Sequence, residues 1–233
     1  MIVITGTSRG IGNELARAYL AKGELVVGIG RTNTIDHERY MHIYCDLSDV
    51  NQVAQLSLPH QNEPIVFIHN AGILGEINRF SQQENAVINL SEVMQVNFFA
   101  GVSIVEKLLQ TTAPEQELTI VFISSGAGKR PIASWSAYCA SKAAVDLWLS
   151  TLMLEEQENG RNLLRCYAIA PGVVDTAMQE KIRGTNKEFF TAHEQFSKLK
   201  TTGQLIAPSF VAQKIIEIVN RPTFDQVICS IND

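Results

Sequence analysis

Seven short apolar segments, separated by stretches with helical spacing, constrain the fold of this 233-residue chain more than any other feature of its sequence. Most of these segments are nearly continuous in Val, Ile, Leu and Phe and do not alternate with polar residues. A strand has this composition when helices cover both faces of its sheet, as they do in parallel sheets. The sequence therefore predicts buried parallel strands at residues 2–5, 25–29, 41–45, 65–69, 118–123, 163–169 and 227–231.

Helical patterns fill the intervals between these segments. Apolar residues recur at helical spacing across residues 11–19, and Gly23 then provides a C-cap. The two longest helical patterns cover about residues 92–110 and 135–158, and a last helix begins at Pro208.

This alternation predicts a single α/β domain over residues 1–233, built on a doubly wound, Rossmann-like parallel sheet with right-handed crossovers. Residues 178–207 interrupt the pattern, because they are richer in charged and polar residues and carry isolated aromatics at Phe189, Phe190 and Phe196. A long insertion of this kind is typical of a substrate lid, although a plain surface excursion has the same composition. We expect a lid.

The charge balance limits the partners of the chain. Its 19 Lys and Arg residues against 24 Asp and Glu residues leave a net charge of −5 at neutral pH. Nucleic acids attract clustered Lys and Arg, and this sequence has no such run. We therefore expect no nucleic-acid partner.

The sequence also argues against membrane, secreted and metal-binding proteins. No apolar stretch approaches the roughly 18 residues that span a bilayer, and the first residues carry no basic leader. The four cysteines are scattered without a C-x-x-C pair, so we expect neither a disulfide framework nor a zinc site. These features predict a cytoplasmic protein with reduced thiols, no metal and no membrane partner.

A glycine-rich turn, Thr5-Gly6-Thr7-Ser8-Arg9-Gly10-Ile11-Gly12, joins the first predicted strand to the first predicted helix. Ligands of open α/β sheets bind at the carboxyl ends of the strands. Glycines there let backbone N–H groups approach a pyrophosphate, which the positive end of the helix also attracts. Such turns also occur for structural reasons alone, but the position directly after an apolar strand favours dinucleotide binding. Gly128-Lys129 does not belong to a P-loop, because Arg130 follows it in place of Ser or Thr. The residues around Ser124 and Ser125 do not form the G-x-S-x-G motif of a nucleophile elbow.

Four further motifs follow the glycine turn along the chain. They are Asn70-Ala71-Gly72, Asn97, Ser125 with Tyr138 and Lys142, and Pro171-Gly172. Each motif alone is weak, since Y-x-x-x-K occurs by chance in many helices. The five together, in this order, resemble the short-chain dehydrogenase/reductase family in its single-domain form, and the resemblance covers essentially the whole chain.

Tyr138 and Lys142 lie four residues apart and therefore share one face of a helix. A nearby ammonium favours the phenolate and lowers the tyrosine pKa toward working pH. A tyrosine of this kind suits the general acid of carbonyl reduction, in which the cofactor supplies the hydride. Ser125 can hydrogen-bond the substrate carbonyl. Family spacing favours it over Ser124, and the sequence leaves open whether Ser124 shares the role.

The resemblance implies further roles. Asn97 would hold a water that links Lys142 to solvent, although an asparagine that satisfies a helix kink gives the same pattern. His69 stands where the family usually has an asparagine, and we expect it to be structural because it ends a buried strand. The implied catalytic residues are Asn97, Ser125, Tyr138 and Lys142. The implied cofactor-binding residues are Gly6, Ser8, Arg9, Gly10, Ile11, Gly12, Arg31, Asp46, Leu47, Asn70, Ala71, Gly72, Tyr138, Lys142, Pro171, Gly172, Val173 and Thr176.

The end of the second predicted strand indicates the cofactor. NAD-specific relatives usually place an acidic residue there, on the ribose hydroxyls. This strand is followed by Arg31, with no carboxylate until Asp36. The guanidinium groups of Arg31 and Arg9 suit a 2′-phosphate, with Ser8 and Thr32 as possible donors, whereas a single arginine could be a solvated surface charge. The sequence therefore predicts NADP(H).

These features together predict an NADPH-dependent reductase that acts on a small ketone, diketone or aldehyde. In its glycine turn and in residues 196–208 the chain looks closest to the sepiapterin reductase and benzil reductase group. The alternative is a non-catalytic NADP(H)-binding signalling or scaffold protein on the same fold. By the same resemblance we expect a homo-oligomer, a dimer or tetramer, paired through the two long helices.

Overall fold

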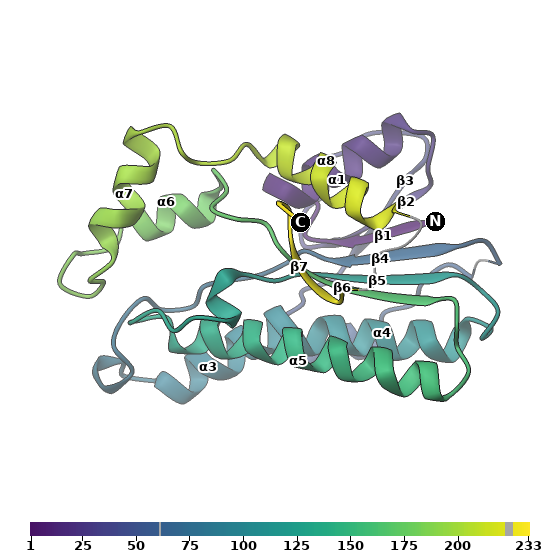
Figure 1. Ribbon diagram of the computed structural model, residues 1–233, viewed down its shortest axis with the longest axis horizontal. Helices are drawn as coiled ribbons and strands as arrows, with labels where there is room; N and C mark the ends of the chain where they lie inside the picture. The colour runs from purple at the N-terminus through teal and green to yellow at the C-terminus, as the bar shows by residue number, and fades with distance from the viewer. Residues whose placement is uncertain (61, 222–225) are drawn as a thin grey trace.

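In the described part of the chain, seven parallel strands form one sheet, as the sequence predicts (Figure 1). The computed structural model describes residues 1–60, 62–221 and 226–233. The strand order is β3-β2-β1-β4-β5-β6-β7, and every neighbouring pair is parallel. Each strand lies within one residue of its predicted bounds. The strands are β1 (Ile2–Thr5), β2 (Val26–Gly30), β3 (Tyr40–Tyr44), β4 (Ile65–His69), β5 (Leu118–Ile123), β6 (Leu164–Ala170) and β7 (Ile228–Ser230).

The strand order reverses beside β1. The chain runs outward from β1 to β2 and β3, and then returns to place β4 on the other side of β1. Thr5, the last residue of β1, is therefore paired with Ile29 on one side and His69 on the other. Ligands of doubly wound sheets bind outside the carboxyl ends of the strands at such a reversal. The loops that follow Thr5 and His69 flank this position.

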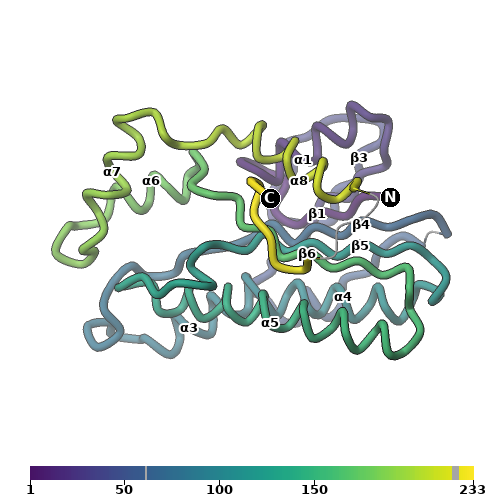
Figure 2. The backbone as a smooth tube through the Cα atoms, viewed as in Figure 1, coloured from purple at the N-terminus to yellow at the C-terminus, as the bar shows by residue number. Residues whose placement is uncertain are grey.

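Helices cover both faces of the sheet (Figures 1 and 2). α1 (Gly10–Ala21) and α8 (Pro208–Val219) pack together on one face, and α3 (Ala86–Met94), α4 (Ala100–Thr111) and α5 (Ser136–Glu158) cover the other. The short helix α2 (Val50–Gln55) lies against α4. Within β1, Ile4 is buried in the core cluster that contains α1 and α8 residues, whereas Val3 is buried in the cluster beneath α4 and α5. Burial on both faces explains why the strands are apolar at consecutive positions.

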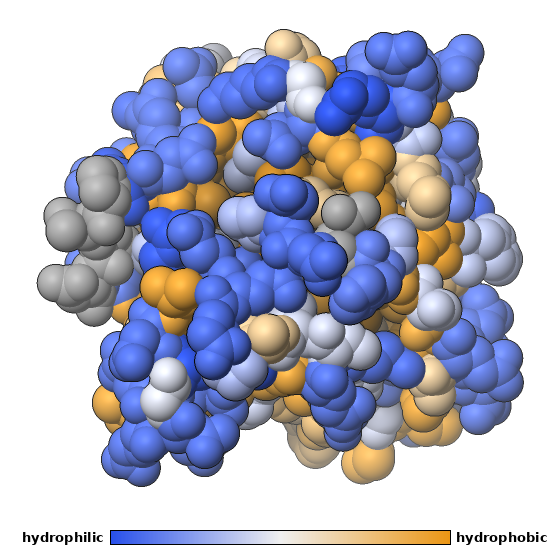
Figure 3. Space-filling view, turned by 90° about the vertical axis from the view of Figure 1, so that its right-hand side faces the viewer, coloured by the Kyte–Doolittle hydropathy of each residue, from blue (hydrophilic) through white to orange (hydrophobic). Residues whose placement is uncertain are grey.

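The two ends of the sheet differ. The end at which the strands begin is mostly hydrophilic, with small separate hydrophobic patches (Figure 3). The carboxyl ends lie at the opposite end of the molecule, beside α6 (Ala177–Arg183) and α7 (His193–Thr201) (Figure 1). The segment predicted as an insertion therefore stands at the edge where the sequence places the cofactor.

The helix before β5 is longer than predicted. It runs from Ala86 through a π-helical turn at Gln95–Phe99 to the end of α4. Among the described residues, it is the one helix long and apolar enough to cross a membrane. The expectation that no apolar stretch approaches the roughly 18 residues that span a bilayer is therefore wrong. Ile104 and Leu108 on its inner face are fully buried against the sheet, as in a core helix.

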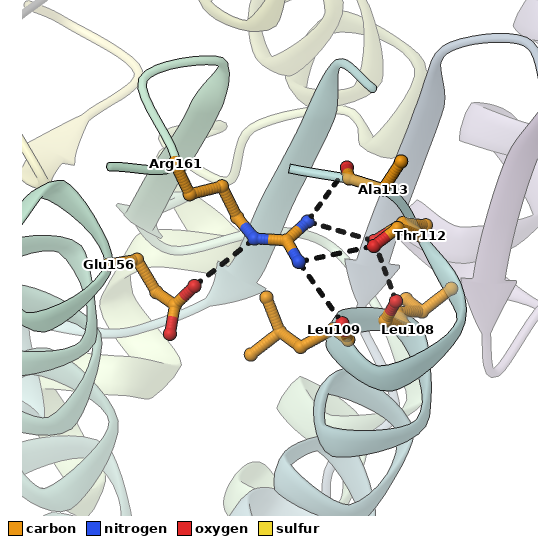
Figure 4. A network of polar contacts seen from close by, with 6 residues as sticks. All are labelled: Leu108, Leu109, Thr112, Ala113, Glu156 and Arg161. Atoms are coloured by element: carbon orange, nitrogen blue, oxygen red, sulfur yellow. Dashed lines mark hydrogen bonds and ion pairs between the residues drawn. The ribbon is translucent and has the colours of Figure 1, made fainter. Parts of the chain in front are cut away.

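Arg161 ties the end of α5 to the end of α4 (Figure 4). Its side chain is buried and pairs with Glu156 at 3.1 Å. The other two guanidinium nitrogens donate to the Thr112 hydroxyl and to the carbonyls of Leu109, Thr112 and Ala113, at 3.0–3.2 Å. Arg161 thereby satisfies carbonyl groups that the end of α4 leaves without helical partners.

Replacing Arg161 by Ala should lower the free energy of unfolding by about 2–4 kcal/mol, because buried acceptors and Glu156 lose their partner. Urea denaturation measures the loss. The matched control is Lys214→Ala, which removes an exposed ion pair with Glu217 and should cost less than about 1 kcal/mol. Equal small losses for both variants would contradict this account of the network.

Candidate active site

The glycine turn after β1 has the backbone that only glycine adopts readily. Gly6 and Gly10 have φ values of +74° and +59°. A Cβ on Gly12 would collide with the carbonyl of Gly6 and the amide of Asn70. Helix α1 begins at Gly10 without a side-chain cap, so no side chain competes for its first N–H groups. A tight turn and an uncapped helix N-terminus fit the phosphates of a dinucleotide.

Thr5 and Asn70 lock this turn to the loop after β4. The Thr5 hydroxyl accepts hydrogen bonds from the backbone N–H groups of Asn70 and Ala71, both at 3.0 Å. In return, Asn70 Nδ2 donates to the carbonyls of Thr5 and Gly6, both at 3.1 Å. The Asn70-Ala71-Gly72 motif therefore fixes the shape of the glycine turn, as well as lying where the resemblance expects it to line the cofactor.

Arg31 lies beyond β2 with an exposed side chain. Its Nη1 lies 3.6 Å from Asp46 Oδ2. Hydrogen bonds from the Ser48 hydroxyl and backbone N–H are the main reason that the pKa of Asp46 is lowered, and Arg31 adds to the effect. Arg9, the N-cap residue of α1, is also exposed. The exposed side chains of Arg9 and Arg31 can therefore bind an anionic ligand at the carboxyl ends of the strands.

The residues that follow β6 face the glycine turn. Gly172 has a φ of +74°, and Val174 forms a parallel bridge with Ile206. A Cβ built on Gly10 would lie 3.4 Å from Thr176 Cγ2, so Thr176 reaches the start of α1. The structure therefore brings Thr176 to the same crevice as the turn after β1.

The four side chains expected to be catalytic converge beside these loops. Lys142 Nζ lies 5.6 Å from the centroid of the Tyr138 ring, and Tyr138 is hydrogen-bonded to Ser125. A Cβ built on Gly72 would lie 3.4 Å from Asn97 Oδ1 and 3.8 Å from Lys142 Nζ. Because Gly72 has no side chain, Asn97 and Lys142 share the space beside it.

Burial dominates the electrostatics of this group. It raises the pKa of Tyr138 to about 12, against the lowering effect of the hydrogen bond with Ser125. It also lowers the pKa of Lys142 to about 8, against the attraction of Asp146. The lowered tyrosine pKa expected from the Tyr138–Lys142 spacing is therefore absent in this state. Lys142 faces the tyrosine ring and donates to the Ile123 carbonyl at 2.7 Å, which leaves desolvation as the larger effect on Tyr138.

Asn97 lies inside the π-helical turn and is fully buried. Its Oδ1 accepts from the Ile73 N–H at 2.8 Å, and its Nδ2 donates to the Ile73 carbonyl at 2.9 Å. Asn97 thus holds the strand-like backbone that follows Gly72. These contacts agree with the structural interpretation of Asn97, in which the asparagine stabilises an irregular turn of the helix. The role of Asn97 in proton relay stays a prediction.

This arrangement has counterparts among known proteins. A family model described as short chain dehydrogenase matches residues 1–187. The chain belongs to the short-chain dehydrogenase/reductase family. It is therefore an oxidoreductase, and its family uses a nicotinamide cofactor.

Relatives of this short-chain dehydrogenase/reductase include carbonyl reductases. It is 33% identical over 232 residues to a benzil reductase ((S)-benzoin forming) of Bacillus subtilis, across 96% of this chain and 94% of that protein. It is 28% identical over 252 residues to sepiapterin reductase of Rattus norvegicus, across 95% and 92% of the two chains. A solved short-chain dehydrogenase/reductase structure from Saccharomyces cerevisiae superposes with a TM-score of 0.85 at 27% identity, covering 100% and 96%. The expected resemblance to the benzil and sepiapterin reductase group is confirmed.

An aromatic cluster joins the segment 178–207 to Tyr138 of this short-chain dehydrogenase/reductase. Trp135 stacks on Phe190 at 5.3 Å and 9°, and contacts Tyr138 edge to face at 5.7 Å. Phe196 packs against Trp135 at 5.2 Å. Ser134 has a φ of +71°, and its hydroxyl donates to the Phe189 carbonyl at 2.6 Å. The expected insertion consists of two short helices, α6 and α7, docked over Tyr138.

We predict that residues 178–207 exchange amide hydrogens faster without ligand than with NADPH and an alcohol product. Besides the aromatic cluster, the segment is held by contacts such as those of Lys181 with the Gly75 carbonyl and of Lys200 with Asp175, which are partly exposed. Surface segments held in this way open at low free-energy cost. Hydrogen exchange read by mass spectrometry in both states measures the difference. Strong and equal protection in both states would contradict a lid.

Sequence reasoning missed Ser141 and Trp135. Ser141 accepts from Asn97 Nδ2 at 3.0 Å and donates to the Tyr138 carbonyl at 2.8 Å, so it connects two residues of the site. A small polar residue one helical turn after Tyr138 is a signal that could have indicated it. Trp135 gave no such signal, because its contacts depend on where residues 178–207 pack.

His69 is buried and has hydrogen-bond partners on both ring nitrogens. It meets the Thr5 hydroxyl at 3.1 Å and the Val96 carbonyl at 3.0 Å. Burial, followed by the charge of Lys142, lowers the pKa of His69 to about 3, so the ring stays neutral. These contacts support the structural role expected from the sequence.

Proposed function

We propose that this short-chain dehydrogenase/reductase is an NADPH-dependent carbonyl reductase that acts on a small ketone, diketone or aldehyde. The convergence of Ser125, Tyr138, Lys142 and Asn97 beside the uncapped glycine turn carries the proposal. The names of the relatives from Bacillus subtilis and Rattus norvegicus support the substrate class. A protein that only bound the dinucleotide would have no chemical need for a buried tyrosine and a buried lysine together.

Ser125, Tyr138 and Lys142 each have a separate role in this reduction. Ser125 donates a hydrogen bond to the carbonyl oxygen, and Tyr138 delivers the proton to that oxygen. Tyr138 holds its proton at neutral pH, and because burial raises its pKa, proton delivery requires stabilisation of the phenolate that forms. Lys142 binds the ribose of the cofactor, and its ammonium stabilises the phenolate that the transfer leaves behind. NADPH supplies the hydride that reduces the carbonyl carbon.

The preference for NADPH is assigned to Arg31 and Arg9. In the sequence, no carboxylate follows β2 until Asp36, so β2 ends without the acidic residue that would bind the ribose hydroxyls of NADH. The Arg31 guanidinium is exposed and its contact with Asp46 is long, at 3.6 Å, so it is available to form charge-assisted hydrogen bonds with the phosphate. Gly6, Ser8, Gly10, Ile11 and Gly12 would hold the pyrophosphate from the glycine turn.

Consumption of NADPH with a panel of aliphatic ketones, aromatic diketones and aldehydes tests the function. We expect turnover of at least one class, with the corresponding alcohol as product. Tight NADPH binding without turnover of any carbonyl would replace the reductase with the NADP(H)-binding scaffold protein.

The exposed side of the two long helices supports self-association. Phe99, Leu147 and Leu154 are 48%, 71% and 62% exposed there, which leaves apolar surface on α5 and beside α4. We infer that two copies pair through this face, and that pairing explains the apolar composition of the Ala86–Thr111 helix. Light scattering should show a dimer or tetramer, and Leu147→Glu should shift it toward the monomer. A monomer at micromolar concentration would contradict the inference.

A further inference from the structure

Helix α5 carries a buried acidic residue on the face that presents Tyr138 and Lys142. Asp146 follows Lys142 by one helical turn, and the three residues are 7%, 5% and 6% exposed. Buried carboxylates are rare unless they are paired or hydrogen-bonded. The motifs that define the site do not include Asp146, so its burial requires a separate explanation.

Asp146 contacts the turn that carries Ser125. The Ser124 hydroxyl donates to Asp146 Oδ1 at 2.5 Å, and Ser124 directly precedes the serine that is hydrogen-bonded to Tyr138. The turn Gly126–Gly128 packs against the same helix. A Cβ built on Gly128 would lie 2.9 Å from Asp146 Oδ2 and 3.0 Å from the Lys142 carbonyl. The carboxylate is therefore enclosed between α5 and the turn after β5.

The titratable groups around Lys142 come from two elements. Tyr138 and Asp146 lie on its own helix, and His69 faces it from β4 in the neutral form. Burial raises the pKa of Asp146, against the lowering effects of the hydrogen bond with Ser124 and the charges of Lys129 and Lys142. Among the described residues, Asp146 is the acidic group that favours the charged form of Lys142, while burial disfavours that form. The buried ammonium thus depends on a carboxylate that is itself held by Ser124.

We propose that Asp146 is a positioning residue of the active site, which keeps Lys142 in its ammonium form and, through Ser124, fixes the turn that presents Ser125 to Tyr138. The inference rests on the proposed function, because both positioned residues belong to the proposed catalytic group. It also assigns to Ser124 a role different from that of Ser125: Ser124 holds Asp146, and Ser125 faces the substrate.

Two conservative variants separate the charge from the hydrogen bond. Asp146→Asn keeps an oxygen that accepts from Ser124 but removes the negative charge. Ser124→Ala keeps the carboxylate but removes the hydrogen bond. Lysine labelled with ¹³C at Cε reports the titration of Lys142 by NMR in each protein without any turnover, and Lys142→Arg identifies its signal. Steady-state rates across pH report the catalytic consequence.

Asp146→Asn should move the Lys142 titration, and the alkaline limb of kcat, down by roughly one pH unit or more, because the ammonium loses its countercharge. Turnover should then fall about tenfold at pH values above the new limb and recover at lower pH. Ser124→Ala should lower kcat at every pH and leave the Lys142 titration within a few tenths of a unit of its original position. An Lys142 titration unmoved by Asp146→Asn, or moved equally by both variants, would overturn the proposal.

Thermal unfolding verifies that each variant is folded. If Asp146→Asn does not fold, the double variant Ser124→Ala/Asp146→Leu removes both partners together and leaves no orphaned donor. It should lower the Lys142 titration as Asp146→Asn would, and an unmoved titration in the double variant would likewise overturn the proposal. If the unmutated protein reduces no carbonyl, the proposed function fails, while the NMR titration still decides the role of Asp146 toward Lys142.

Discussion

Tyr138→Phe lowers carbonyl turnover by roughly 10²–10⁴-fold, the loss that follows removal of a positioned general acid. The substitution removes one oxygen and keeps the ring against Trp135, so the fold and the aromatic cluster should persist. NADPH affinity should change little, because the glycine turn, Arg31 and the loop after β4 remain intact. Steady-state reduction of a responsive ketone and fluorescence titration of NADPH measure the two effects separately.

A buried tyrosine far from the site provides the matched control. Tyr19 lies on α1, and its buried hydroxyl has no hydrogen-bond partner among the residues that the structure describes. Tyr19→Phe should leave turnover unchanged, since it makes the same chemical change away from the reacting atoms. Near-normal turnover in Tyr138→Phe would mean that another group donates the proton.

Lys142→Ala should differ from Tyr138→Phe in one respect. It removes both the ammonium beside the tyrosine and a ribose contact, so turnover and NADPH affinity should fall together. The double variant should lose little more turnover than the worse single variant, because the two residues act as one unit.

Arg31→Asp should reduce the NADPH preference, expressed as the ratio of kcat/KM for NADPH to that for NADH, by roughly 10²-fold. Charge-assisted hydrogen bonds contribute about 1.5–3 kcal/mol, which corresponds to about 10–150-fold in affinity. The new carboxylate additionally repels the 2′-phosphate and can accept from the ribose hydroxyls of NADH. Steady-state kinetics with each cofactor gives the ratio.

Arg39→Asp is the control for the change in charge. Arg39 is exposed and lies just before β3, at the amino ends of the strands, whereas Arg31 follows the carboxyl end of β2. Arg39→Asp should leave the ratio of kcat/KM for NADPH to that for NADH unchanged. Comparable kcat/KM for both cofactors in the unmutated protein would contradict the assignment of Arg31 to the 2′-phosphate.

The strands could be predicted closely because most of them are buried on both faces, although β3 has no buried residue. Continuous apolar segments such as those of β5 and β6 have few alternatives in a chain with helical spacing between them. The glycine turn could also be placed, since Gly6 and Gly10 adopt backbone angles that side chains disfavour. These features depend on local sequence, and local sequence was sufficient.

The features that could not be predicted from the sequence depend on contacts between distant segments. The π-helical turn at Gln95–Phe99 forms where Asn97 binds the backbone of Ile73, and no spacing in the helix itself indicates it. The pKa of Tyr138 was predicted to fall because Lys142 is nearby in sequence, whereas the structure raises it through burial. Asp146 looks like an ordinary polar position on a long helix until Ser124 is brought against it. Tertiary contacts and burial determine all three of these features.

Transfer of deuterium from labelled NADPH to a carbonyl substrate tests the central claim most directly. Cofactor that carries deuterium at the transferable position is mixed with a responsive ketone, and the alcohol is analysed by mass spectrometry. The account predicts an alcohol with deuterium on the carbinol carbon from the unmutated protein, and very little alcohol from Tyr138→Phe although that variant still binds NADPH. Alcohol without deuterium, or labelled alcohol formed equally fast by Tyr138→Phe, would contradict it.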